Sequence, residues 1–306
     1  MKIAILNDLH FGVKNSSSIF IKQTEEFLED LFFPKLKKEG VKHILFLGDF
    51  LDSKRSVTPP VLKSIRKSFF KPIEDLGITV HAILGNHDIF YKNSLDTSGT
   101  FEVLDMHPNI IFYNEPKVLD FDGTKIALVP WITEDTAETS LEFIKNCNAD
   151  FIGGHFEIVG ARLIGTKKCE KGLSLNDFEK FKEVWSGHFH QEQKLKNVVY
   201  VGAPLELSWA DVGSKRHFYI FDTKTQKCKR TRISKNIFKK VHFDGDISKI
   251  NFEELENCFV KVIISDNTNL YDLIEKLESV NLHEYKIIED ITLVSKNTSN
   301  HDEISL

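Results

Sequence analysis

The stretch VWSGHFH, residues 184–190, places two histidines one residue apart, directly after a glycine and at the end of an apolar run. Residues two apart on an extended chain face the same side, so His188 and His190 can reach one ligand together. A single histidine at a strand end is more often a hydrogen-bonded core residue than a metal ligand. The meaning of the pair therefore depends on what stands at the ends of the other strands.

Apolar runs of strand length alternate with helix-period segments along the first 190 residues. The runs at 2–8, 42–49 and 78–88 are typical of buried strands, whereas 18–38 has apolar residues at helical spacing, with a break expected near Pro34. A further helix is expected at 58–77, and further strands at 125–131, 149–156 and 184–190 and in a hairpin that begins HFYIFDTKT. This alternation predicts an α/β core with layered sheets.

Five of the apolar runs end in side chains that commonly bind metals. The motifs NDLH, LGDF, LGNHD, GGHF and SGHFH supply Asp8, His10, Asp49, Asn86, His87, Asp88, His155, His188 and His190. Ligand-binding groups gather beyond the carboxyl ends of the strands in sheets wound this way. Five of the twelve histidines occur in these motifs, which favours one shared site over separate turn and core residues. The other seven histidines are expected to have ordinary structural positions.

This combination of side chains fits a site for two metal ions. Divalent manganese, iron and zinc accept imidazole and carboxylate ligands together. One carboxylate can bridge two ions roughly 3.5–4 Å apart, and such a pair clamps the attacking and leaving oxygens of a phosphate ester. The glycines before Asp49, Asn86, His155 and His188 leave room for sharp turns and close approach.

The ordered set D-x-H, G-D, G-N-H-D, G-H and G-H-x-H, over residues 8–190, resembles the calcineurin-like metallophosphoesterase family. The resemblance implies a two-sheet sandwich flanked by helices, of the α/β class with layered α+β character. It also implies two divalent metal ions, manganese being expected and magnesium the alternative. The first ion would be held by Asp8, His10, Asp49 and His190, and the second by Asp49, Asn86, His155 and His188.

The resemblance also assigns roles to the two residues that follow Asn86. His87 would not bind metal, but would stabilise the phosphate in the transition state or protonate the leaving oxygen. Asp88 would orient His87, as carboxylates behind a functional histidine do.

The segment YVGAPLELSWADVGSKRHFYIFDTKT (200–225) resembles the one that follows the last metal histidine in SbcD-type DNA repair nucleases. The stretches FDGTKIALVPWITED and KEVWSGHFH resemble the nuclease subunits of T-even-type bacteriophage recombination endonucleases. The likeness runs over most of residues 1–295 and implies hydrolysis of DNA phosphodiester bonds, by exonuclease action on duplex ends and endonuclease action on single strands. It also implies a homodimer and a coiled-coil, SMC-like ATPase partner in an SbcCD-like recombination and repair complex.

The sequence divides near residue 230. We expect a metallophosphoesterase domain at 1–230, a small α+β domain at 231–295 that the resemblance implies caps DNA, and a polar tail at 296–306. Net charge is −5, but residues 241–306 alone carry 14 acidic and 5 basic side chains.

A basic strip lies just before this acidic segment. Residues 227–240 hold seven Lys and Arg and no acid, and the candidate DNA contacts are Lys227, Lys229, Arg230 and Arg232. A solvated strand face explains the strip equally well.

Two departures from related nucleases concern the site and the partner. Asp52 stands where archaeal and eukaryotic relatives have a histidine, so an extra catalytic histidine is in doubt. Residues 296–306 lack the amphipathic helix that would bind the ATPase; either 265–295 makes that contact, or the partner is lost, or the chain is incomplete. Phe69 and Phe70 are candidate dimer anchors, with burial in the monomer core as the alternative.

Composition excludes several other classes. No apolar run reaches the roughly 18 residues of a membrane span, and the start of the chain has the pattern of a strand rather than a signal peptide. The four cysteines are far apart and form no CxxC pair, which favours a reduced cytoplasmic chain, in the host cytoplasm if phage-encoded. Two alternatives stay open: a small-molecule or nucleotide phosphodiesterase of the same fold, and a non-catalytic scaffold.

Overall fold

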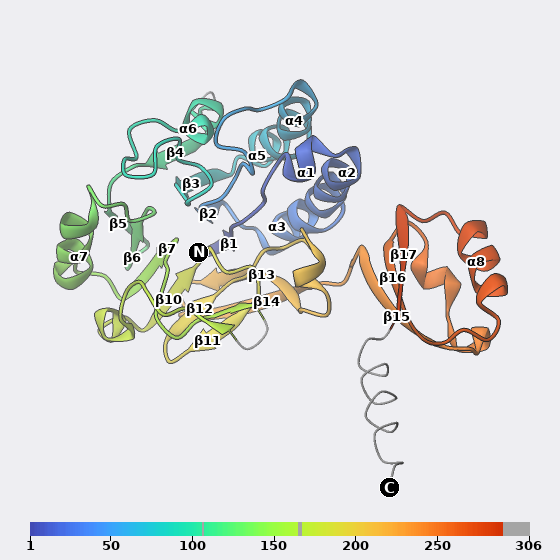
Figure 1. Ribbon diagram of the computed structural model, residues 1–306. Coiled ribbons are helices and arrows are strands. Elements are labelled where there is room, and N and C mark those ends of the chain that lie inside the picture. Colours follow the sequence, from blue (N-terminus) through green and yellow to red (C-terminus); the bar gives the residue numbers. More distant parts are fainter. Residues whose placement is uncertain (106, 165–166, 290–306) are drawn as a thin grey trace, which may run out of the picture. The chain divides into compact units, whose positions relative to one another are not determined.

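Four apolar runs form the parallel part of the first sheet in the computed structural model, which describes residues 1–105, 107–164 and 167–289 (Figure 1). The strands are β1 (Lys2–Leu6), β2 (His43–Leu47), β3 (Thr79–Ile83) and β4 (Ile110–Tyr113). The predicted hairpin is confirmed: β13 (Arg216–Asp222) and β14 (Lys227–Ile233) are antiparallel, and β13 pairs with β1. The sheet order is β14-β13-β1-β2-β3-β4.

The second sheet also has six strands and a parallel centre. Its order is β11 (Gln193–Leu195), β12 (Val198–Tyr200), β10 (Glu183–Ser186), β7 (Phe151–Gly154), β6 (Thr124–Val129) and β5 (Lys117–Phe121). Strands β6, β7, β10 and β12 are parallel, and β5 and β11 are the antiparallel edges. A two-stranded sheet of β8 (Arg162–Ile164) and β9 (Lys167–Lys168) lies between β7 and β10 in the chain.

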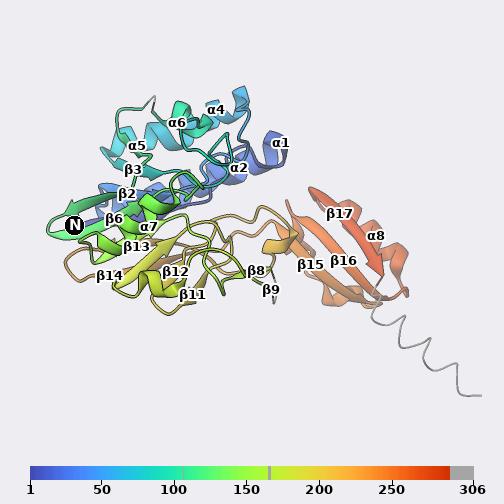
Figure 2. The same cartoon turned by 60° about the vertical axis from the view of Figure 1, so that its left-hand side comes forward.

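Alternation along β1 shows how the layers pack. Ile3 and Ile5 belong to the core between the two sheets, together with Trp185 and Phe221. Ala4 and Leu6 point the other way, into the core that the first sheet forms with its helices. Figure 2 shows α2, α4 and α5 on the side of β2 and β3 that faces away from β10–β12. The predicted two-sheet sandwich flanked by helices is therefore confirmed.

The helices of this unit are short, and several are continuous with one another. They are α1 (Val13–Ser16), α2 (Ser18–Glu26), α3 (Phe33–Glu39), α4 (Pro59–Ile65), α5 (Lys71–Leu76), α6 (Gly99–Leu104) and α7 (Ala137–Asn146), with a 3₁₀ turn at Leu175–Phe178. π-Helical segments, Phe27–Phe32 and Arg66–Phe70, join α2 to α3 and α4 to α5. Each precedes a proline, Pro34 or Pro72, whose missing N–H and bulky ring a wider turn accommodates. The break predicted near Pro34 is thus a π turn in a helix that continues to Glu39.

The chain divides into two compact units, and the second has its own core. The first unit comprises Met1–Leu207 and Ser214–Ser234, and the second comprises Ser208–Gly213 and the chain from Lys235 onward. The boundary predicted at 230 falls inside β14, which ends at Ile233 and remains paired with β13 along its length. The polar tail expected at 296–306 lies outside the described residues.

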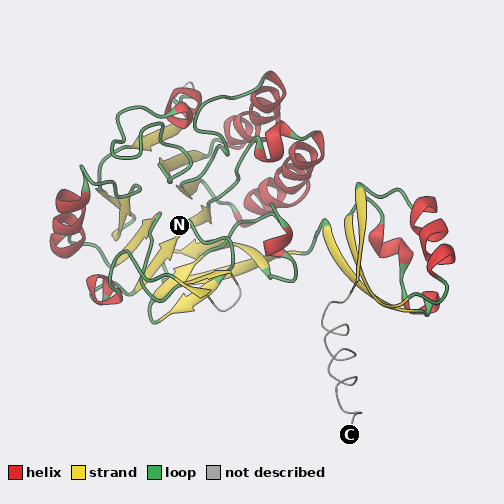
Figure 3. Cartoon of the chain, in the orientation of Figure 1, coloured by secondary structure: helices red, strands yellow, loops and turns green. Residues whose placement is uncertain are grey.

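The second unit is a small α+β fold. Its parallel strands are β15 (Phe238–Asp244), β16 (Phe259–Asp266) and β17 (Glu284–Glu289), accompanied by α8 (Leu270–Ser279) and 3₁₀ turns at Trp209–Asp211, Ile247–Lys249 and Phe252–Leu255. Helices cover one face of this sheet (Figure 3). The Trp209 ring packs 5.0 Å from that of Phe238, which explains why Ser208–Gly213 belongs to this unit. No helix among the described residues is both long and apolar enough to cross a membrane.

Two histidines stack on neighbouring strands between the sheets. His43 Nδ1 lies 3.1 Å from His81 Nε2, and His81 Nδ1 lies 3.0 Å from the Tyr113 hydroxyl. The ring of Phe121 meets both imidazoles edge-on. Burial and the neighbouring His43 lower the pKa of His81 from 6.5 to about 4.

The His81 pKa predicts a loss of stability in mild acid. Between pH 6.5 and 4 the unfolded chain binds a proton at residue 81 that the folded chain does not, so stability falls as pH falls through this window. At pH 5 this one group should cost about 2 kcal/mol relative to neutral pH. His81→Gln keeps polar groups but cannot titrate. In urea unfolding, its free energy of unfolding should therefore fall between pH 7 and pH 5 by about 2 kcal/mol less than that of the wild type. His242→Gln, at an exposed ring, is the control; an unchanged loss in His81→Gln would contradict the prediction.

Candidate metal centre

The carboxyl ends of five parallel strands deliver the predicted site residues to one place. The loop after β1 carries Asp8 and His10, that after β2 carries Asp49, and that after β3 carries Asn86 and His87. From the second sheet, β7 is followed by His155 and β10 by His188 and His190. The backbone N–H of His188 lies 3.2 Å from Asp8 Oδ2, so the loops of the two sheets are joined at this point.

These loops have strained backbone at four of the candidate ligands. Asp8, His10, Asp49 and His188 all have positive φ, of 49°, 44°, 56° and 88°. Few non-glycine residues adopt this region, and those that do cluster where a site requires it. Gly85 is needed for close approach, because a Cβ there would lie 2.2 Å from Asp49 Oδ1.

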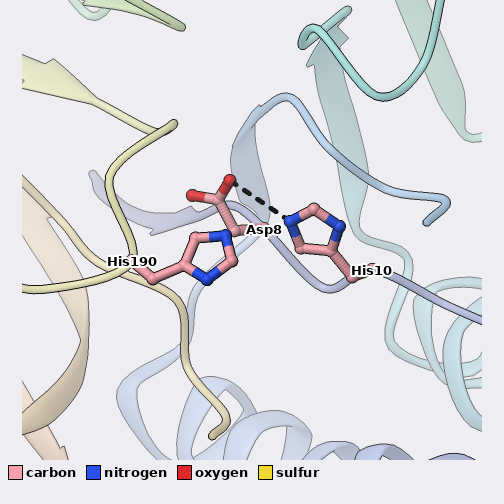
Figure 4. Close-up of side chains that lie close together, drawn as sticks. All are labelled: Asp8, His10 and His190. Carbon is pink, nitrogen blue, oxygen red and sulfur yellow. Dashed lines mark ion pairs between the residues drawn. The ribbon is translucent and has the colours of Figure 1, made fainter. Parts of the chain in front are cut away.

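One group of candidate ligands comprises Asp8, His10 and His190, which point toward one another in Figure 4. Their possible ligand atoms all lie within 4.8 Å of one another. His10 Nε2 is 3.8 Å from Asp8 Oδ1 and 3.6 Å from Asp49 Oδ2. Asp8 and His10 are almost fully buried, with exposed fractions of 0% and 2%.

The second group comprises Asp49, Asn86, His155 and His188. Asn86 Oδ1 lies 3.0 Å from His155 Nε2 and 2.9 Å from His188 Nδ1. His155 Nε2 is also 3.3 Å from Asp49 Oδ2, while its Nδ1 lies 2.8 Å from the carbonyl of Leu47. Asp49 Oδ2 therefore faces histidines of both groups, which is the position that a bridging carboxylate needs.

The electrostatics of the cluster follow from this central carboxylate. Burial favours its neutral form, but His155 and His10 hold the pKa of Asp49 below its usual range. Burial likewise opposes charge on His155, yet Asp49 and Asp8 raise the pKa of His155 to about 9. Burial and the neighbouring His155 lower the pKa of His188 to about 3.

The donor set fits divalent cations. His10 Nε2 is buried without a hydrogen-bond partner among the described residues, although two carboxylates face it within 4 Å. Buried polar atoms are normally satisfied, and a cation between these groups would satisfy this one. A combination of imidazole nitrogens with carboxylate and amide oxygens is suitable for binding manganese, iron or zinc.

Asp88 organises the loops. Its carboxylate accepts backbone N–H groups from Asp49 at 2.7 Å, Phe50 at 3.0 Å and Gly85 at 2.8 Å, and the Thr100 hydroxyl at 2.6 Å. Burial and the adjacent Asp49 raise the pKa of Asp88 above the usual range. Asp88 thereby ties the loop after β2 to the loop after β3.

The ring of His87 is positioned by Asp52. The prediction assigned this role to Asp88, but His87 Nδ1 lies 3.1 Å from the main-chain carbonyl of Asp52, and the Asp88 carboxylate hydrogen-bonds the loops instead. An Nδ1–H that donates to this carbonyl fixes the ring orientation and does not occupy Nε2. The ring stands edge-on to His10, with centroids 4.8 Å apart.

Asp52 also contacts His10, which sequence reasoning missed. Its Oδ1 lies 3.4 Å from His10 Nδ1, on the side of the ring away from Asp8 and Asp49. Carboxylates commonly orient a ligand histidine in this way. The sequence showed only that Asp52 stands where some relatives have a histidine. It did not indicate which side chain the Asp52 carboxylate contacts.

The four basic candidates do not form one basic face. Successive residues of β14 alternate in direction: Cys228 packs toward the core between the sheets, so Arg230 and Arg232 share its side and Lys227 and Lys229 take the other. Lys227 pairs in register with Asp222, beside the start of β1 and away from the site, whereas Arg232 pairs with His217 near the site edge. Arg230 lies 3.0 Å from Glu192, and Lys229 3.8 Å from Glu39. DNA contact by these residues stays a prediction, best supported for Arg232.

The candidate dimer anchors have different surroundings. Phe69 is 1% exposed and packs against Phe33, Phe46 and Phe50, so it is a core residue, as the alternative held. Phe70 is half-buried against the ring of His107.

Comparisons with known proteins agree with this geometry. The family model described as calcineurin-like phosphoesterase matches residues 1–192. "Exonuclease subunit 1" of Enterobacteria phage T4 is 33% identical over 299 residues, covering 95% of this chain and 85% of that protein.

The solved structures that match this chain are more distant. A purple acid phosphatase from yellow lupin seeds has 13% identity and a TM-score of 0.43, with coverage of 77% of this chain and 54% of that one. A dimetal phosphatase from Danio rerio has 10% identity and a TM-score of 0.42, with coverage of 72% and 91%. These structural likenesses are too remote to bear on substrate. The family match over most of the folded chain, joined to the cluster of buried carboxylates and histidines, shows that this chain belongs to the calcineurin-like phosphoesterases and is a metal-dependent hydrolase.

Proposed function

We propose that the protein is a DNA nuclease that hydrolyses phosphodiester bonds, on duplex ends as an exonuclease and on single strands as an endonuclease. One observation carries the proposal: 33% identity to a phage exonuclease subunit along 95% of the chain. The cluster of Asp8, His10, Asp49, Asn86, His155, His188 and His190 suits a phosphodiester of any kind, so the substrate class rests on the relative.

We assign metal-binding, proton-donating and positioning roles to the residues of the site. Asp8, His10, Asp49 and His190 would hold one divalent ion, and Asp49, Asn86, His155 and His188 the other. When bound, manganese or magnesium ions would supply positive charge for the phosphate and acidity for the attacking water. His87 holds a proton at Nε2 and gives it to the leaving oxygen, while Asp52 fixes the orientation of that ring. Asp88 holds the loop after β2 against the loop after β3 through its hydrogen bonds to their backbone N–H groups.

Assembly is proposed from the same relative and from the family resemblance. The phage protein is named as a subunit, which supports a protein partner, and a coiled-coil, SMC-like ATPase in a recombination complex is the partner we propose. A homodimer is supported by the exposed apolar side chains of Phe101 and Ile111, 37% and 44% exposed. A light-scattering mass near that of one 35.2 kDa chain would contradict the dimer. We further propose that the small second unit caps the DNA.

Substrate class is tested with purified protein and three labelled substrates. Duplex DNA, single-stranded DNA and a generic ester, bis(4-nitrophenyl) phosphate, are incubated with Mn²⁺, with Mg²⁺ and with EDTA. We expect both DNAs to be degraded with Mn²⁺ and neither with EDTA. Turnover of the generic ester alone would instead favour a small-molecule phosphodiesterase. A protein that binds no metal and cleaves nothing would be a scaffold.

A further inference from the structure

A small cavity adjoins the second group of metal ligands and has no place in the roles above. It has a volume of about 130 Å³ and is lined by His155, Trp131, Ile132, Phe156, Leu173 and Glu157. Most of this lining is apolar, and its one acidic residue, Glu157, whose Oε1 accepts from the Cys169 thiol at 3.7 Å, would repel an anion. The cavity therefore suits an uncharged ring whose edge carries N–H donors for Glu157. A nucleobase has this chemistry, whereas a second phosphate does not.

Trp131 supplies an indole ring to the lining of this cavity. It follows β6 in the stretch FDGTKIALVPWITED, and its indole lies 5.2 Å from the ring of His188 and 5.8 Å from that of His155, centroid to centroid. The residue is held on both sides: its backbone N–H donates to the Leu84 carbonyl at 2.8 Å, and its side chain packs on the buried cluster around Leu84 and Ile89. A fixed, half-buried indole beside the metal ligands is well placed to stack on a base.

The position of His87 indicates which nucleoside would occupy the cavity. A general acid must stand beside the leaving oxygen, and His87 lies with His10 and Asp52, at the first group of ligands. A separate cavity of about 220 Å³ opens there, beside Asp52 and Phe11. Trp131 lies instead with His155 and His188, so its cavity is on the side away from the leaving group.

We propose that Trp131 and Glu157 form a nucleobase subsite for the nucleoside that keeps the phosphate after cleavage. This rests on the proposed function in so far as the natural ligand is DNA. Stacking on an aromatic side chain is tolerant of sequence, so the subsite would favour nucleic acid over other phosphodiesters without selecting a particular base.

Chromogenic esters test the subsite without requiring DNA cleavage. The probes are the 4-nitrophenyl esters of thymidine 5′-phosphate and thymidine 3′-phosphate, and methyl 4-nitrophenyl phosphate, which has no base. In each, water adds to phosphorus and the P–O bond to nitrophenolate breaks, with release of a proton. The thymidine therefore keeps the phosphate.

We expect one thymidine ester to exceed the methyl ester in kcat/KM by about tenfold or more. Trp131→Leu should remove most of this ratio, whereas Trp131→Phe should retain it, because phenylalanine still stacks. Tyr271→Leu, at an aromatic ring that is 88% exposed in the second unit, is the matched control and should leave the ratio unchanged. A wild-type ratio near one, or the full ratio in Trp131→Leu, would overturn the proposal.

Fluorescence gives a second readout that does not depend on turnover. Thymidine 5′-phosphate should quench indole emission of the Mn²⁺-loaded wild type, but not of Trp131→Phe, in which only Trp185 and Trp209 remain. Quenching of equal size in both proteins would contradict stacking on Trp131. If these esters behave as expected but DNA is not cleaved, the nuclease proposal fails and the subsite stands. If DNA is cleaved but neither thymidine ester exceeds the methyl ester in kcat/KM, the nuclease proposal stands and the subsite proposal fails.

Discussion

Asp49→Asn is expected to abolish hydrolysis and to prevent the second metal ion from binding. Asp49 Oδ2 faces His155 and His10 at 3.3 Å and 3.6 Å, so this carboxylate contacts histidines of both groups of candidate ligands. Asparagine fills the same space but removes the charge. A bound ion supplies several kcal/mol of stabilisation to the transition state, so the rate should fall by about a thousandfold or more. Metal binding is measured by calorimetry with Mn²⁺, and the rate with the DNA substrates.

Asp122→Asn is the matched control for Asp49→Asn. It removes a carboxylate that is 61% exposed and faces the N-terminal amine, so metal binding and rate should not change. Circular dichroism of both variants establishes that the fold is kept. If Asp49→Asn binds two ions with wild-type affinity, Asp49 does not bridge them.

His87→Ala is expected to keep both metal ions and lose most of the activity on DNA. The ring lies beside His10, but its Nδ1 is occupied by the Asp52 carbonyl at 3.1 Å, which leaves Nε2 for a proton. Loss of a general acid typically costs between about a hundredfold and ten-thousandfold. An ester of 4-nitrophenol needs no proton on its leaving oxygen, so its rate should fall far less. The comparison of DNA with bis(4-nitrophenyl) phosphate therefore measures the role of His87 directly.

Two results would contradict this role of His87. DNA cleavage by His87→Ala at the wild-type rate would remove the residue from the mechanism. An equal loss on DNA and on the nitrophenyl ester would show that His87 stabilises the phosphate rather than donating a proton. His242→Ala, at an exposed ring, controls for the loss of an imidazole.

Much of the first unit could be predicted from local pattern. The apolar runs that became β1, β2 and β3 are buried on both faces, so they appear in the sequence as continuous apolar segments. Contacts between distant segments were not predictable in this way. Ser208–Gly213 belongs to the second unit because Trp209 packs on Phe238, and nothing near residue 209 indicates this.

The site shows the same division between local and long-range information. Strand-end position was enough to predict that the ligand candidates would meet. The partners of Asp88 and Asp52 depend on how the loops after β1, β2 and β3 cross, and sequence spacing does not report that crossing. The division of the basic strip between two faces, by contrast, follows from the alternation of side chains along β14 and was available from the sequence.

The most direct test of a dinuclear centre is anomalous X-ray scattering from crystals grown with Mn²⁺. Two manganese peaks are predicted, one against Asp8, His10 and His190 and the other against Asn86, His155 and His188. Asp49 should contact both. A single peak, or two peaks without Asp49 between them, would contradict the assignment.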